Sequence, residues 1–258
     1  MPSMYVFLLL AGGGGGFLSG LLGIGGGIVM FPALLYLPPL LGIGSIDVKS
    51  ITGLTMVQGF FASLAGMLFY NKERLVQRKL VGALGVSLFA SSLAGSLLSK
   101  RVPDEVLLFI FGALAVIASV MMLIPRSYAR DDAREHEVTF NPALAAIIGI
   151  TVGFLLGMVG QGGAFITIPI MLYVLKIPLR VAFGSTLAIG LFSATAGTAG
   201  KLVTGQIPLD MAVFMLLGAM PAARLGAFVG KRTDTRFLRW LLAFLITGSA
   251  IKILTDIV

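Results

Sequence analysis

Residues 16–26 read Gly-Phe-Leu-Ser-Gly-Leu-Leu-Gly-Ile-Gly-Gly, and residues 153–163 read Gly-Phe-Leu-Leu-Gly-Met-Val-Gly-Gln-Gly-Gly. The two stretches align at a constant offset of 137, and Pro169 follows the second as Pro32 follows the first. After a six-residue length difference the offset becomes 131, which brings Thr186 onto Thr55. An alignment of this length, with a single change of offset, predicts that the chain consists of two copies of one unit.

Long apolar runs surround these stretches and predict a membrane protein. Hydrophobic residues make up 57% of the 258 residues and charged residues only 12%, whereas a soluble domain carries about 25% charged residues. The charges gather in short clusters between runs that are about long enough to cross a ~30 Å hydrocarbon core as helices. The expected fold class is therefore an all-α membrane protein.

The apolar runs divide into ten segments, five in each copy. The first repeat, 1–125, is expected to hold segments at roughly 4–22, 25–41, 50–70, 80–99 and 105–124. A polar cytoplasmic connector, 126–140, separates it from the second repeat, 141–258. The second repeat is expected to hold segments at roughly 141–159, 162–176, 181–200, 208–230 and 236–256.

An odd number of crossings per copy would insert the second copy upside down relative to the first, giving two inverted-topology repeats. If all ten segments cross, the loops on one side carry 13 Lys and Arg residues and the loops on the other side carry 5, counted from the sequence. Because basic loops stay in the cytoplasm, the charge difference supports inversion and places both termini outside. Reading segments 1–2 and 6–7 as re-entrant hairpins preserves the same parity, so both models stay open.

The doubled glycine motifs are the candidate substrate site. In transporters with inverted repeats, the substrate lies near the midplane between interrupted helices. A helix that begins just after the glycines would point its free N–H groups and positive dipole end at the break, which suits an anion. Close helix packing is the alternative reading, and we favour it for Gly12–Gly16. The candidate binding residues at the two breaks are Gly23, Gly25, Gly26, Gly27, Gly160, Gln161, Gly162 and Gly163.

Polar residues in the segment after each hairpin form a second candidate group. Thr55 and Thr186 are repeat mates, Gln58 lies one turn after Thr55, and Ser185 precedes Thr186. Hydroxyls in membrane helices also bond to their own backbone, which is the alternative for each of them. Arg224 is the only charge that the sequence places clearly within a segment, as a candidate for anion contact or gating.

Charge and composition exclude several other functions. The formal net charge of +8 comes from basic residues spread over several loops, which argues against a nucleic-acid partner. The chain has no cysteine and one histidine, His136, so neither a cofactor nor a metal site is predicted. An intramembrane enzyme is disfavoured because the segments offer no cysteine, histidine or paired carboxylates.

The doubled motif resembles the sulfite exporter TauE/SafE family of bacterial inner-membrane proteins. The resemblance covers nearly the whole chain apart from the polar connector. Its family glycines map to Gly23, Gly25, Gly26, Gly160, Gly162 and Gly163, while the stretch 221–226 departs from the family pattern. The matching stretches are GLLGIGGGIVMFPALL (20–35), GMVGQGGAFITIPIML (157–172), IPLRVAFGSTLAIGLFSATAGTAGKLVTGQIPLD (177–210) and GAMPAARLGAFVGKR (218–232).

The resemblance implies a multi-pass protein of the bacterial cytoplasmic membrane that moves a small sulfur-containing anion by alternating access. Sulfite, thiosulfate, sulfoacetate and other organosulfonates are the implied substrates. A passive anion channel and a non-transporting membrane assembly factor are the alternatives. The lipid bilayer is the expected environment, and coupling to a proton or another ion and assembly as a homo-oligomer both stay open.

Overall fold

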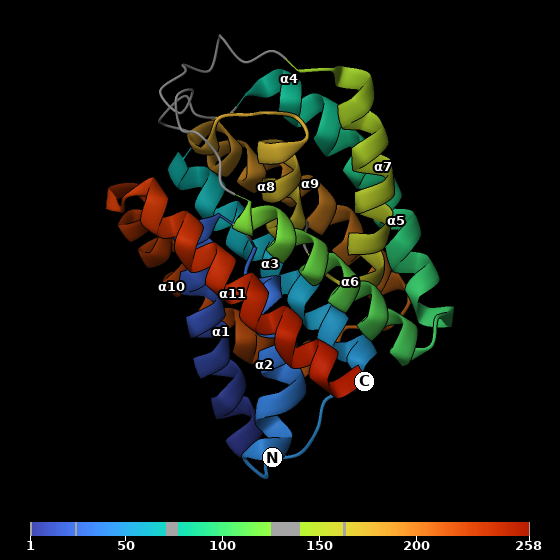
Figure 1. Ribbon diagram of the computed structural model, residues 1–258. Coiled ribbons are helices and arrows are strands. Elements are labelled where there is room, and N and C mark those ends of the chain that lie inside the picture. Colours follow the sequence, from blue (N-terminus) through green and yellow to red (C-terminus); the bar gives the residue numbers. More distant parts are fainter. Residues whose placement is uncertain (1, 24, 71–76, 125–139, 162–163, 258) are drawn as a thin grey trace.

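The computed structural model describes residues 2–23, 25–70, 77–124, 140–161 and 164–257 as a bundle of helices (Figure 1). Nearly all of the predicted connector, 126–140, lies outside the described residues. The elements are α1 (Pro2–Leu22), α2 (Gly27–Leu40), α3 (Val48–Tyr70), α4 (Arg78–Leu80), the π-helix η2 (Val81–Gly85), α5 (Val86–Leu98), the 3-10 helix η3 (Ser99–Arg101), α6 (Asp104–Leu123), α7 (Pro142–Val159), α8 (Ala164–Tyr173), α9 (Leu179–Val203), α10 (Leu209–Arg232) and α11 (Thr235–Ile257).

The predicted all-α membrane fold is confirmed for the described residues. Each of the ten expected segments contains a helix, and α4, η2 and α5 together form the fourth. Six helical stretches are long and apolar enough to cross a membrane: 2–22, 78–101, 104–123, 142–159, 184–203 and 209–230. With 14 and 10 residues, α2 and α8 are about 21 and 15 Å long, too short to cross a ~30 Å core alone.

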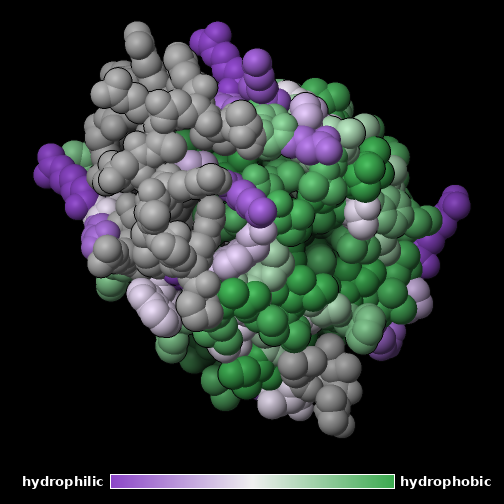
Figure 2. Space-filling view, turned by 45° about the horizontal axis from the view of Figure 1, so that its top comes forward, coloured by the Kyte–Doolittle hydropathy of each residue, from purple (hydrophilic) through white to green (hydrophobic). Residues whose placement is uncertain are grey.

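The outer surface of the bundle is apolar. Large hydrophobic side chains are exposed on several helices, including Phe109 (63%), Trp240 (69%) and Phe244 (74%). Figure 2 shows hydrophobic residues over much of the visible face that is not grey, with hydrophilic side chains toward its edges. A soluble protein rarely exposes contiguous apolar surface on this scale, so these faces are suited to lipid.

Two pairs of helices make very close contacts through glycine. A Cβ atom on Gly226 of α10 would overlap the carbonyl oxygen of Phe17 in α1, and one on Gly95 of α5 would overlap that of Phe154 in α7. Gly12 and Gly16 also lie directly on the backbone of α10, as the packing interpretation of these glycines expects. Small residues let helix backbones approach closely in a membrane.

The centre of the bundle is formed by α3 and α9, which pack against each other. Every residue from 51 to 59 of α3 is buried, so this helix has no lipid-facing side over that stretch. Both described ends of the chain lie toward the lower end of the bundle in Figure 1. The membrane face to which they belong stays a prediction.

Candidate functional site

The first helix break lies between α1, which ends at Leu22, and α2, which begins at Gly27. Gly23, Gly25 and Gly26 have φ angles of 68°, 70° and 74°. This left-handed region is open to glycine and costly for residues with a Cβ atom. Gly26 is the N-cap of α2 and no side chain caps this end, so the first N–H groups of α2 lack an intrahelical acceptor.

The chain turns back on itself at this break. A Cβ atom on Gly26 would lie 2.7 Å from the carbonyl oxygen of Gly15, so α2 starts directly against α1. Pro32 in α2 cannot donate to the carbonyl of Ile28. The Ser249 hydroxyl of α11 donates to that oxygen instead, at 2.9 Å. The hydrogen bond lost to proline is thus replaced from a neighbouring helix, as the membrane interior requires.

The second break follows α7, whose last residue is Val159. Gly160 is the C-cap, with a φ angle of 73°, and its N–H donates to the carbonyl of Leu156. The Gln161 N–H donates to the same oxygen at 3.1 Å, and the carbonyl of Gly160 accepts a hydrogen bond from Thr55 Oγ1 of α3 at 2.8 Å. The candidate residues Gly162 and Gly163 lie outside the described residues.

Both breaks lie against the middle of α3, and they contact each other. A Cβ atom on Gly25 would lie 3.7 Å from the Cα atom of Gly59, while Gly160 packs on the backbone of Thr52 two turns earlier. The Gln161 side chain lies directly against Gly27, the first residue of α2, with Oε1 nearer to it than Nε2. The structure therefore brings the amide of the second break to the open N-terminus that follows the first.

Three buried polar side chains around this contact have no hydrogen-bond partner among the described residues. They are Ser19, Gln58 and Gln161, which are 0%, 0% and 2% exposed. A Cβ atom on Gly15 would lie 2.6 Å from Nε2 of Gln58. A Cβ atom on Gly26 would lie 3.2 Å from the Cβ atom of Ser19. We call Ser19, Gln58, Gln161 and the α2 N-terminus at Gly26–Gly27 the central polar cluster.

Unpaired groups of this kind are rare in folded proteins. A buried donor or acceptor without a partner costs about 1–3 kcal/mol, and most buried polar atoms have one. The central polar cluster offers amide and hydroxyl hydrogens beside a positive helix end, with no carboxylate in the cluster. Chemically, it can bind a small anion through neutral donors.

The other candidate residues form no hydrogen bonds with the central polar cluster among the described residues. Ser185 and Thr186 are buried in α9; Ser185 Oγ accepts from the backbone N–H of Gln77 at 3.1 Å, and Thr186 Oγ1 donates to the carbonyl of Ala182. Arg224 is exposed on α10, whereas its neighbour Ala223 packs on α1. Arg224 therefore points away from the contact between α10 and α1 that Ala223 makes.

The expectation that Arg224 is the only charge within a segment is wrong, because α9 holds a buried lysine. Lys201 is 0% exposed. Its Nζ atom donates to Thr52 Oγ1 at 2.8 Å, Ser99 Oγ at 2.7 Å, the carbonyl of Met158 at 3.0 Å and Gln206 Oε1 at 3.0 Å. The expected segment 181–200 ends one residue before Lys201, whereas α9 continues to Val203. The apolar pair after the lysine is the signal that could have extended the segment.

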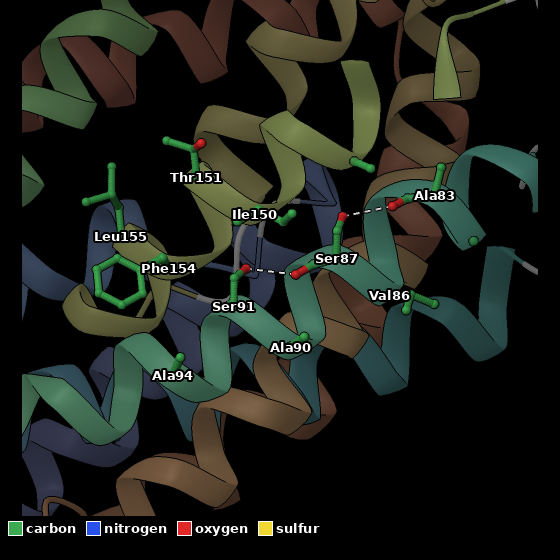
Figure 3. Close-up of a pocket in the computed structure, with 12 residues that line it drawn as sticks. Ala83, Val86, Ser87, Ala90, Ser91, Ala94, Ile150, Thr151, Phe154 and Leu155 are labelled. Atoms are coloured by element: carbon green, nitrogen blue, oxygen red, sulfur yellow. Dashed lines mark hydrogen bonds between the residues drawn. The ribbon is translucent and has the colours of Figure 1, made fainter. Parts of the chain in front are cut away.

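A separate groove lies between α5 and α7 (Figure 3). It encloses about 830 Å³ and is lined by small and apolar residues such as Ala90, Ile150 and Phe154. The Ser87 and Ser91 hydroxyls at its edge donate to carbonyls of their own helix, each at 2.8 Å. None of the candidate binding residues lines it, so the groove is not part of the central polar cluster.

Comparison with known proteins identifies relatives along almost the whole chain. The model of one family, described as "Sulfite exporter TauE/SafE", matches residues 8–253. The chain is 23% identical to the probable membrane transporter protein YunE of Bacillus subtilis, over 90% of each chain. It is 26% identical to the probable membrane transporter protein MJ0441 of Methanocaldococcus jannaschii, over 90% of this chain and 88% of the relative. No solved structure matches it significantly.

Proposed function

Because the chain belongs to the sulfite exporter TauE/SafE family, we propose that it is a secondary transporter that moves a small sulfur-containing anion across the cytoplasmic membrane by alternating access. The central polar cluster is the observation that supports this proposal most directly. Its two glutamine amides and one hydroxyl are buried and unpaired, and they surround a helix N-terminus that no side chain caps.

An anion in the central polar cluster would satisfy these donors together. Sulfite and sulfonate groups carry three oxygens around sulfur, so one group can accept several hydrogen bonds at once. The Nε2 group of Gln58 would donate to these oxygens, as would that of Gln161 once its amide turns Nε2 toward Gly27 in place of Oε1. The first N–H groups of α2 would donate along the helix axis. Hydrogen bonds to a charged partner contribute about 1.5–3 kcal/mol each, which would offset the loss of the anion's hydration.

Thr55 has a supporting role in this proposal. Its hydroxyl donates to the carbonyl of Gly160, and that oxygen would otherwise face the anion with a negative partial charge. The bond also fixes Gly160 beside Gln161. Thr55 would therefore orient the second break without contacting the substrate.

The close helix pairs support two inverted repeats, 1–125 and 141–258, as the moving units. Phe17 and Phe154 are predicted repeat mates, as are Gly95 and Gly226, and the two glycines meet the two phenylalanine carbonyls in the same way. Equivalent contacts of this kind are expected from a pseudo-two-fold axis. Rocking about α3 and α9, which contact each other at the centre, would open the central polar cluster to one face at a time.

Uptake of labelled sulfite into proteoliposomes, with and without a pH gradient, tests the proposal. We expect saturable uptake that thiosulfate or sulfoacetate reduces in competition, and a response to the gradient if protons are coupled. A lack of flux for every sulfur anion would overturn the proposal. Flux that neither saturates nor responds to any gradient would identify a passive channel.

A further inference from the structure

The ammonium group of Lys201 is held by oxygens from four parts of the chain, all of them neutral. Thr52 belongs to α3, Ser99 to η3, Met158 to the last turn of α7, and Gln206 to the turn before α10. These four acceptors share three N–H groups. Taking a charged amine out of water costs several kcal/mol even after relaxation, and none of these partners supplies a compensating negative charge.

The neighbouring charge makes this position more positive. Lys49, a second cation, lies one turn before Thr52 in α3, and the Thr52 hydroxyl donates to the Lys49 carbonyl at 2.7 Å. Lys49 has its own partner in Asp104, at 3.8 Å, and both side chains are partly exposed. That carboxylate is therefore engaged with a surface lysine, while Lys201 stays buried with neutral groups.

The position of Lys201 connects it to the second break. Its bond to the Met158 carbonyl meets the C-terminal end of α7, where unpaired carbonyls carry a negative partial charge. Its bond to Thr52 reaches the α3 residue on whose backbone Gly160 packs. One turn further along α3, Thr55 holds the Gly160 carbonyl. Lys201 and Thr55 thus hydrogen-bond to two of the carbonyls at this break, which reduces the negative partial charge that an anion would meet.

We propose that Lys201 supplies positive charge to the translocation pathway, where it offsets the carbonyl end of α7 and helps to balance the charge of the anion in the central polar cluster. This inference rests on the proposed function and adds a residue that determines selectivity for anions. It also explains how a site built from neutral donors can hold an anion: the full charge lies behind the second break, and the neutral donors make the contacts. Lys201 is a positioning residue in this sense, since it acts on the substrate through its field.

Two substitutions separate the charge of Lys201 from its hydrogen bonds. Lys201→Met removes the charge at similar length, and Ser99→Ala removes one of the four acceptors while leaving the charge. For any two opposite unit charges about 10 Å apart, Coulomb attraction at an effective dielectric of about 20 corresponds to a change of roughly tenfold in affinity. We therefore expect Lys201→Met to weaken sulfite binding by about tenfold or more, and Ser99→Ala to change it by less than about threefold.

Binding is measured as the rise in melting temperature of the purified full-length protein with sulfite concentration. Lys100→Met, which removes an exposed lysine beside Ser99, is the surface control and should bind like the wild type. Lys201→Gln, which keeps a polar tip, replaces Lys201→Met if that variant does not fold. If either Lys201 variant binds sulfite as tightly as the wild type, or if Ser99→Ala loses as much sulfite affinity as the Lys201 variant, the inference about Lys201 is overturned while the proposed function is not. A wild-type protein that sulfite and sulfoacetate fail to stabilise would overturn the proposed function together with it.

Discussion

Gln161 is the side chain at which the proposed site can be tested most sharply, because its effects on stability and on binding should have opposite signs. Its amide is buried beside Gly27 without a hydrogen-bond partner among the described residues. Gln161→Met removes both polar atoms and keeps an unbranched side chain of similar length. The substitution therefore leaves the packing against α2 nearly unchanged while removing the donor.

The size of each effect follows from the contacts. An unpaired buried amide costs about 1–3 kcal/mol, so its removal should raise the stability of the unliganded protein by up to that amount. At about 2–4 °C per kcal/mol for a chain of this size, the melting temperature should rise by a few degrees. A lost hydrogen bond to an anion costs about 1.5–3 kcal/mol, so the dissociation constant for sulfite should increase roughly 10- to 100-fold.

Thermal unfolding of the purified protein with and without sulfite gives both quantities, and uptake into proteoliposomes gives the effect on transport. Ser119→Ala is the matched control, because Ser119 pairs with Thr247 between α6 and α11 at 2.7 Å and takes no part in the central polar cluster. It should lower stability without changing the affinity for sulfite. If Gln161→Met lowers the melting temperature, or transports sulfite like the wild type, the central polar cluster is not the binding site.

Three further predictions concern the helix breaks. Gly160→Ala should prevent folding into a monodisperse protein, as seen by size-exclusion chromatography, because its φ angle is 73° and a Cβ atom would overlap the backbone of α3; Gly14→Ala, with open space around it, should behave normally. Ser249→Ala should lower the stability by about 1–2 kcal/mol in thermal unfolding, since it leaves the carbonyl of Ile28 without its side-chain donor. Gln58→Met should weaken sulfite binding, and its combination with Gln161→Met should cost less than the sum of the two if both amides hold one anion.

Much of the fold could be predicted from the sequence. Apolar runs and the glycine motifs placed the helix ends at the first break within a few residues, since α1 ends at Leu22 and α2 begins at Gly27. The membrane environment and the family relationship were also predicted, and both are supported by the helices and by the family match. The repeat topology and the outside location of the termini stay predictions.

The candidate site was predicted less completely. Gln58, Gln161 and the glycines of the first break were named from spacing, and the structure brings them around one helix N-terminus. Ser19 was missed because a serine in an apolar helix gives no signal of its own. Arg224 was named as a candidate, and it is exposed on α10.

The sequence by itself determined which segments are helices and where they break, because hydrophobic length and the left-handed conformation of glycine are properties of the local chain. The tertiary structure alone decided which side chains face one another, because that depends on how each helix is rotated about its axis and on which helix covers it. Lys201 illustrates the difference. Its charge suggests the end of a helix and contact with water, yet packing of α3, η3 and α7 around α9 surrounds it with oxygens, three of them from distant segments, and buries it completely.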